Sequence, residues 1–207
     1  MPDDTARPAG TDEALARLLA GNRRFAAHRA RHPDRDGMRR AKLAQGQFPY
    51  AVVLGCSDSR VPLEIVFDQG LGDLFVVRVA GNTASDALVV GSIEYAVTQL
   101  GTRLLMVLGH EGCGAVASAV EVARNGTVLP GRLPEVVAPI IPGVELTPGA
   151  SNEAVIAAAV RTNVRRAVGL LRAEPMLADL VAAGDLAIVG AEYHLATGEV
   201  GVIDPPS

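Results

Sequence analysis

Residues 103–116 read Arg-Leu-Leu-Met-Val-Leu-Gly-His-Glu-Gly-Cys-Gly-Ala-Val, and this stretch sets the pattern for the whole chain. Its apolar first half does not alternate with polar residues, which is typical of a strand buried on both faces. Similar runs occupy 50–55 and 74–79, and helix-compatible segments follow at 84–100 and 114–124. Because strands that alternate with helices favour a parallel sheet with right-handed crossovers, we predict an α/β fold with a mostly parallel central sheet flanked by helices.

The rest of the chain adds helices at the start and two strands at the end. Apolar spacing predicts helices over 11–29 and 37–45, and again over 152–172. Segment 128–150 holds five of the thirteen prolines, so it is expected to be an extended loop or a broken helix. The last two apolar runs indicate two strands around a tight turn. We expect a single domain over 1–207, with an N-terminal helical arm (1–46) and an α/β core (47–207); the two final strands are 186–194 and 199–203.

Composition narrows the class of protein. The 207 residues are 49% hydrophobic and 20% charged, and they contain no uninterrupted apolar stretch long enough for a membrane span. The first ten residues do not resemble a secretory signal, so we expect a cytoplasmic protein without a membrane partner. A net charge of −4 argues against nucleic-acid binding, and the arginine-rich segment 23–40 is interpreted as a solvated or interface-facing helical region.

Both cysteines of the chain lie at the ends of predicted strands. Cys56 opens the phrase Cys-Ser-Asp-Ser-Arg after the first strand, and Cys113 closes His-Glu-Gly-Cys after the third. Ligands of an open parallel sheet gather beyond the carboxyl ends of its strands, where neighbouring strands could bring the two phrases together. Two thiolates and the imidazole of His110 suit zinc, and a fourth tetrahedral position remains for Asp58 or for water.

Two other interpretations of the cysteines stay open at this point: separate buried thiols, or one disulfide. A disulfide is disfavoured in a cytosolic chain, and neither interpretation explains why His110 and Asp58 accompany the cysteines. Asp58 and Arg60 are expected on the same side of an extended segment, where they form either an ordinary ion pair or a switch. If Asp58 turns from zinc to Arg60, a water molecule takes the vacated position on zinc. The pKa of that water falls to roughly 7.

Five phrases follow one another along the chain: Leu-Ala-Gly-Asn-Arg-Arg-Phe at 19–25, Cys-Ser-Asp-Ser-Arg-Val at 56–61, Phe-Val-Val-Arg-Val-Ala-Gly-Asn at 75–82, Ser-Ile-Glu-Tyr-Ala-Val at 92–97 and Gly-His-Glu-Gly-Cys-Gly-Ala-Val at 109–116. With these motifs the chain resembles a β-class carbonic anhydrase over most of its length. The resemblance implies that Cys56, His110 and Cys113 bind one zinc ion per chain, and that Asp58 is an exchangeable ligand of a closed state, controlled by Arg60. It implies reversible hydration of carbon dioxide to bicarbonate and a proton through zinc-bound hydroxide. It also implies an antiparallel edge strand and a homodimer or homotetramer with active sites at an interface.

The resemblance also points to residues of a substrate pocket. Gln47 matches a glutamine that orients the substrate, and Phe75 and Tyr95 match apolar residues that line the cleft. A polar loop residue and ordinary core packing are the alternatives for these three. One subclass carries a tryptophan three residues before its first ligand cysteine and is inhibited by bicarbonate; this chain has Val53 there, which puts such regulation in doubt.

Two competing functions remain. Relatives of the family hydrolyse carbonyl sulfide or carbon disulfide with the same ligands, so the ligands do not separate these substrates from carbon dioxide. A zinc-stabilised or nucleotide-binding module without catalysis is the second competitor. Gly112 and Gly114 form no dinucleotide or P-loop pattern, and a saturated structural zinc site leaves the pairing of Asp58 with Arg60 unexplained.

Overall fold

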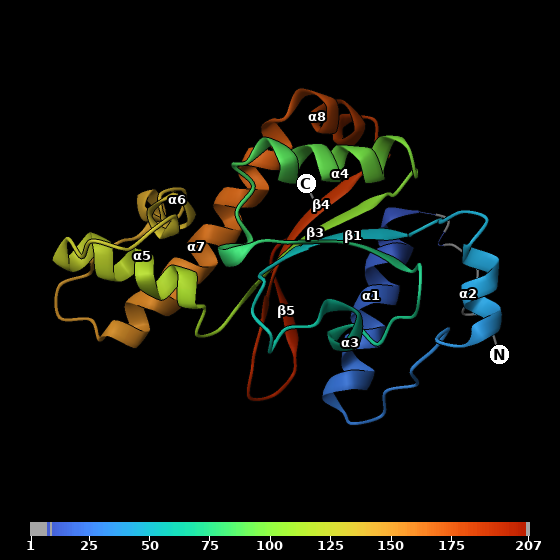
Figure 1. The fold of residues 1–207 in the computed structure, drawn as a ribbon, viewed down its shortest axis with the longest axis horizontal. Coiled ribbons are helices and arrows are strands. Elements are labelled where there is room, and N and C mark those ends of the chain that lie inside the picture. Colours follow the sequence, from blue (N-terminus) through green and yellow to red (C-terminus); the bar gives the residue numbers. More distant parts are fainter. Residues whose placement is uncertain (1–7, 9, 206–207) are drawn as a thin grey trace.

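A five-stranded sheet organises the chain in the computed structural model, which describes residues 8 and 10–205. Its order is β2-β1-β3-β4-β5, with parallel pairing everywhere except between β4 and β5. The predicted α/β fold with an antiparallel edge strand is therefore confirmed (Figure 1). The strands are β1 (Ala51–Gly55), β2 (Leu74–Arg78), β3 (Leu104–His110), β4 (Ala187–Tyr193) and β5 (Val200–Asp204).

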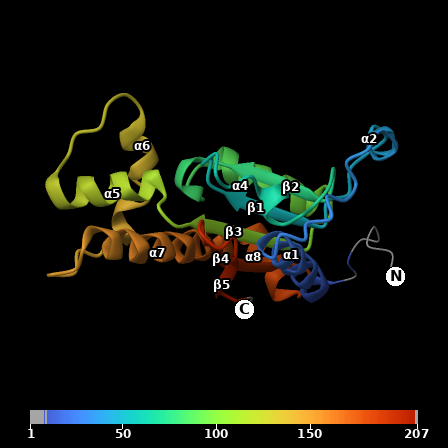
Figure 2. The same cartoon turned by 90° about the horizontal axis from the view of Figure 1, so that it is seen from below.

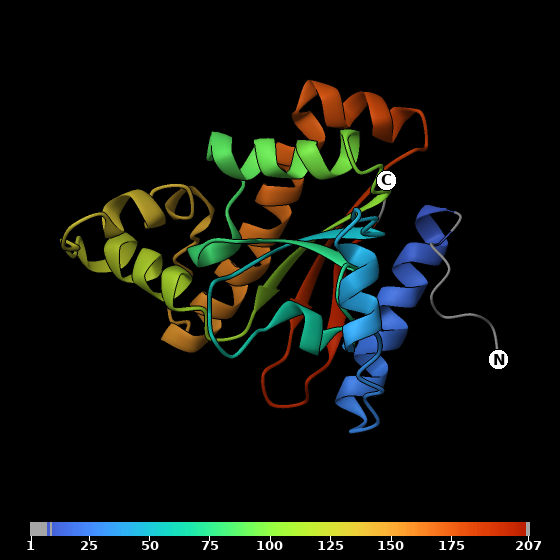
Figure 3. The same cartoon turned by 45° about the vertical axis from the view of Figure 1, so that its right-hand side comes forward.

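Burial along the strands follows their place in the sheet. Every residue of β1, β3 and β4 is buried, whereas the edge strands β2 and β5 are mostly half-buried. A central parallel strand is covered by helices on both faces, which is why these runs are continuously apolar in sequence. Helices α1 (Thr11–Ala26) and α3 (Leu63–Val66) cover one face. Helices α4 (Ala87–Thr98), α8 (Pro175–Ala182) and the second half of α7 (Asn152–Ala173) cover the other (Figure 3).

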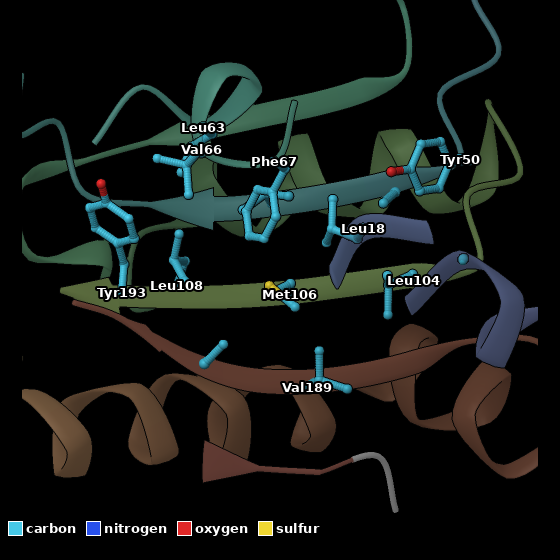
Figure 4. Close-up of a cluster of buried hydrophobic side chains, with 14 of the residues drawn as sticks. Leu18, Tyr50, Leu63, Val66, Phe67, Leu104, Met106, Leu108, Val189 and Tyr193 are labelled. Carbon is cyan, nitrogen blue, oxygen red and sulfur yellow. The ribbon is translucent and has the colours of Figure 1, made fainter. Parts of the chain in front are cut away.

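The core under α1 and α3 is built from large side chains that interdigitate between helix and sheet. Leu18 of α1 and Phe67, just after α3, are fully buried against Met106 of β3 (Figure 4). Burying a side chain of this size stabilises the fold by about 1.5–3 kcal/mol. The short helix α3 was not expected from the sequence, because four residues are too few to establish a helical period.

A helical lobe extends from one end of the sheet (Figure 2). It consists of α5 (Gly114–Asn125), α6 (Leu133–Val137), the 3-10 turn η2 (Ile141–Gly143) and the first half of α7. The proline-rich segment 128–150 is thus a broken helix, one of the two expected forms. Cys56 and Cys113 belong to the apolar cluster of this lobe, so the lobe packs directly on the ends of β1 and β3.

Helix ends account for the remaining differences from expectation. The first helix stops at Ala26 instead of residue 29, and His28 shortly after it adopts a left-handed φ of 54°. Helix α7 ends where Glu174 turns extended before Pro175, and that proline starts α8, which the sequence had not indicated. Helix α2 (Gly37–Leu43) buries none of its residues and lies away from the sheet (Figure 2).

Candidate metal centre

The two cysteine phrases meet because β1 and β3 are direct neighbours. Gly55, the last residue of β1, pairs with Leu108 of β3, so Cys56 and His110 leave the sheet at the same edge. The Sγ atoms of Cys56 and Cys113 and one ring nitrogen of His110 all lie within 4.8 Å of one another. All three residues are buried, and within the described part of the chain they form the cluster of potential metal ligands.

The geometry and chemistry of these three residues fit zinc. The two Sγ atoms are 3.9 Å apart, too far for a disulfide and close to the separation of about 3.8 Å that two thiolates have on tetrahedral zinc with Zn–S bonds of about 2.3 Å. His110 Nδ1 lies 2.9 Å from the carbonyl oxygen of Glu111, which leaves Nε2 toward the cluster. Nε2 is buried without a hydrogen-bond partner among the described residues. A buried nitrogen of this kind calls for a ligand that the chain does not supply.

The pKa values of the three clustered side chains also favour the binding of a cation. The adjacent Cys113 thiol lowers the pKa of Cys56 to about 4, although burial opposes it, and contacts with His110 and the Gly81 N–H lower it further. Cys56 and burial together raise the pKa of Cys113. Burial works to lower the pKa of His110, but the Cys56 side chain, the Glu111 carbonyl oxygen and Asp58 together outweigh it and raise that pKa. One thiolate is therefore present at neutral pH, and metal binding would release the proton held by the Cys113 thiol.

Asp58 stands beside the cluster but is held by Arg60. Its Oδ2 accepts from Arg60 Nη2 at 2.7 Å, and its Oδ1 accepts from Arg60 Nε and from the Arg60 N–H, each at 2.9 Å. Oδ2 remains 3.9 Å from His110 Nε2. Arg60 also donates to the carbonyl oxygen of Gly112 at 3.1 Å, which ties the two phrases together. The forked hydrogen bond to Arg60 holds the pKa of Asp58 well below its usual range, so the carboxylate stays ionised.

The structure does not bring the three expected pocket residues to the cluster. Gln47 lies in the exposed loop before β1, whereas Cys56 follows the opposite end of that strand. Phe75 pairs with Val52 near the start of β1, and its ring lies 6.3 Å from the ring of Tyr95, centroid to centroid. Tyr95 is half exposed on α4. Phe75 and Tyr95 therefore lie beside each other, whereas Gln47 lies in a separate loop, and none of the three belongs to the ligand cluster of the same chain.

Two residues that hold Cys56 in place were not assigned this role from the sequence. Arg78, at the end of β2, donates to the carbonyl oxygens of Cys56 at 2.9 Å and of Asp58 at 2.6 Å. The Gly81 N–H donates to Cys56 Sγ at 3.4 Å. Both residues fall inside the phrase at 75–82, and their place at the end of a strand beside β1 is the signal that could have identified them.

Glu111 is a further residue whose position was not anticipated. Its carboxylate lies 2.9 Å from His194 Nδ1 and accepts from the Leu195 N–H at 3.1 Å. These contacts lower the pKa of Glu111, with His194 as the larger cause. The β4–β5 turn is thereby fastened to the residue that follows His110.

The known proteins that this chain resembles in sequence and in structure, as compared below, are all carbonic anhydrases. Residues 51–200 match the carbonic anhydrase family. Carbonic anhydrase 2 of Mycobacterium tuberculosis is 45% identical over 190 residues, 90% of each chain, and a carbonic anhydrase of Mycolicibacterium smegmatis is 45% identical over 183 residues, 88% of each. A tetrameric β-carbonic anhydrase of Sordaria macrospora has a similar structure, with a TM-score of 0.75 and 25% identity over 91% of this chain and 96% of that one. Within residues 8 and 10–205, no helix combines the length and the apolar character that a membrane crossing requires.

Proposed function

The chain belongs to the β-carbonic anhydrase family, and from this premise we propose that it catalyses the reversible hydration of carbon dioxide with zinc held by Cys56, His110 and Cys113. One observation carries the assignment. Three buried ligand atoms converge within 4.8 Å while Asp58, the remaining candidate, is drawn to Arg60. Three protein ligands and one open position are the arrangement of a catalytic zinc site, whereas structural sites are closed by four.

Each side chain has a separate task. Zinc, when bound, supplies a Lewis acid that lowers the pKa of a water ligand to about 7. Asp58 would accept a hydrogen bond from the attacking water and orient it, because a carboxylate with so low a pKa does not keep a proton at neutral pH. Arg60 holds both oxygens of that carboxylate and prevents it from filling the open position. Asp58 would join the ligands only in a closed state.

The substrate pocket, we propose, is completed by a second copy of the chain. Gln47, Phe75 and Tyr95 lie apart from the zinc ligands of their own chain. The surface over β2 and α4 is suited to association: among the described residues one edge of β2 has no strand partner, and Leu88 on α4 is 81% exposed beside a groove of about 400 Å³. The apolar lining of that groove includes Val77, Val79 and Val89. A homodimer, alone or within a tetramer, would set these residues against the partner's cluster, with the arm (1–46) and core (47–207) contributing together.

The assignment is tested by measuring catalysis and zinc content on the same sample. Stopped-flow hydration of carbon dioxide should be fast in protein with one zinc per chain and should disappear after chelation. Carbonyl sulfide hydrolysis, measured beside it, tests the competing substrate: faster turnover of carbonyl sulfide at equal concentration would overturn the assignment to carbon dioxide. Zinc binding without turnover of either would leave a structural zinc protein.

Mixing the inactive variant Cys113→Ser with the impaired variant Gln47→Ala, beside each variant alone, tests the shared site. Cys113→Ser lacks the zinc ligand, and Gln47→Ala lacks the pocket donor. If Gln47 serves the partner's zinc, random exchange restores about a quarter of the wild-type activity per site, since half of the dimers are mixed and each has one intact site. If Gln47 serves its own chain, mixing restores nothing. His110→Gln replaces Cys113→Ser should the latter fail to fold.

The compartment is a separate proposal. The two free cysteines must stay reduced to bind zinc, which supports a reducing compartment such as the cytoplasm. Fractionation of cells that produce the protein, with a thiol-labelling readout, tests this.

A further inference from the structure

Asn163 is a polar residue on an otherwise apolar face of α7. It is 3% exposed, and Val160, Val164 and Ala167 around it on the helix are buried as well. Burying an amide without a hydrogen bond is costly, because the group loses its bonds to water, so the side chain needs a partner. That partner lies 82 positions away in the chain: Asn163 Nδ2 donates to the carbonyl oxygen of Gly81 at 2.7 Å.

Gly81 lies in the turn between β2 and α4, the 3-10 turn η1 (Ala80–Asn82). Its φ is +77°, and Asn82 follows with φ +45°, so two successive residues occupy the left-handed region. A side chain at position 81 would collide with Ile140, because a Cβ would lie 2.7 Å from Ile140 Cδ1. Only glycine combines this backbone conformation with so close an approach.

The two peptide groups of Gly81 face different partners. Its carbonyl oxygen accepts from Asn163, and its N–H donates to Cys56 Sγ at 3.4 Å. Glycine has few steric restrictions on its backbone angles, so the Gly81 N–H could point in several directions. Its direction is set when the next peptide group, between Gly81 and Asn82, is held in place. The Asn82 N–H of that peptide donates to the Val79 carbonyl oxygen at 3.0 Å, and Asn163 holds its carbonyl side from a helix that is itself packed in the core.

We propose that Asn163 is a positioning residue for the zinc site: by holding the Gly81 carbonyl it aims the Gly81 N–H at Cys56 and strengthens the hold of the thiolate on zinc. The proposal rests on the proposed function, since it assumes that Cys56 is a zinc ligand. An N–H donor at a ligand sulfur stabilises its negative charge and fixes its orientation. Loss of such outer partners typically lowers metal affinity by about 10–100-fold.

The test removes the amide and keeps the branching of the side chain. Asn163→Leu deletes the donor with a side chain that branches at the same carbon, and its zinc affinity, measured by chelator competition, should fall by about tenfold. In cobalt-substituted protein, the sulfur-to-cobalt charge-transfer band should move to longer wavelength, because a sulfur without its N–H donor gives up electrons more readily. A purely structural role for Asn163 would leave this band in place.

A matched control separates positioning from loss of stability. Val168→Ala, one turn further along α7, opens the same core without touching Gly81, and it should keep the affinity and the cobalt band of the wild type. Equal loss in Val168→Ala, or a wild-type band and affinity in Asn163→Leu, would overturn the proposal. If Asn163→Leu does not fold, Asn163→Ser, with a shorter hydroxyl donor, should show an intermediate affinity. Failure of the wild type to bind zinc at all would instead defeat the proposed function.

Discussion

Two regions of the molecule differ in whether one chain is enough to form them. The first is the metal site at the carboxyl ends of β1 and β3, and the second is the substrate pocket, whose expected residues lie elsewhere. At the carboxyl ends, Cys56, His110 and Cys113 already lie within ligand distance of a common ion. The pocket residues, by contrast, are spread over the loop before β1, the strand β2 and the exposed face of α4. We infer that the metal site needs only the pairing of two adjacent strands, whereas the substrate pocket requires association of two chains. Substitutions in the two regions should therefore have separable effects.

Removing a ligand should have the largest effect. Cys113→Ser leaves one thiolate and one imidazole for zinc, and we expect zinc content to fall below about a tenth of the chains, with turnover lost in proportion. Atomic absorption and stopped-flow hydration check both. Ser59→Ala, exposed in the loop after Cys56, is the control and should keep zinc and activity. A Cys113→Ser protein with full zinc would mean that the three residues are not the site.

Asp58 should separate zinc binding from turnover within the same region. Asp58→Asn cannot accept from Arg60 through two oxygens, and the nucleophile loses its orienting acceptor. We expect zinc to be retained and kcat to fall by about 10²-fold, the lower range for a positioned acid–base group. Arg60→Lys keeps the charge without the fork and should lose less. Full activity in zinc-loaded Asp58→Asn would end the proposed role of the pair.

The contrast between the regions also explains how far the sequence could be interpreted. The clustering of the three candidate ligands was predictable because each lies at or just after the end of a recognisable apolar strand, and parallel strand ends meet at one edge. The N-terminal helix, the broken helix over 128–150 and the antiparallel final strands were likewise visible as local patterns. The contact of Asn163 with Gly81 was not, since the two residues are 82 positions apart and no period links them. The half-exposed position of Tyr95 depends on tertiary packing, which residue spacing does not encode.

Gln47→Ala should have a smaller effect, confined to the substrate. Zinc content should not change, because Gln47 lies at the other end of β1. The loss of one neutral hydrogen bond, about 1 kcal/mol, should reduce kcat/KM by up to about tenfold. Gln45→Ala, two residues earlier in the same exposed loop, is the control and should match the wild type. Loss of zinc in Gln47→Ala would show that the two ends of β1 are not independent.

Substitution of Asp68 should have the smallest effect on turnover, although it should lower the stability of the fold. Its buried carboxylate accepts from Arg24 Nε at 2.7 Å and from the N–H groups of Arg31 and His32 at 3.0 and 2.9 Å, which fastens the arm to the core. Burial alone would raise the pKa of Asp68, but these donors outweigh it and lower that pKa.

The sign of the pH dependence follows from this lowered pKa. Because the folded pKa is below the unfolded value of about 3.9, the stabilisation by Asp68 is complete above that pH and disappears as pH falls through the folded pKa. Asp68→Asn should therefore reduce the free energy of unfolding by about 3 kcal/mol at pH 7 and by less in acid, as urea denaturation at several pH values would show. Asp185→Asn is the control: its pair with Arg103 is half exposed at 3.8 Å and should contribute about 0–1 kcal/mol. If Asp68→Asn lowers zinc affinity as well as the free energy of unfolding, the arm and the metal site form one cooperative unit. That result would contradict the inference that the metal site depends only on the pairing of β1 with β3.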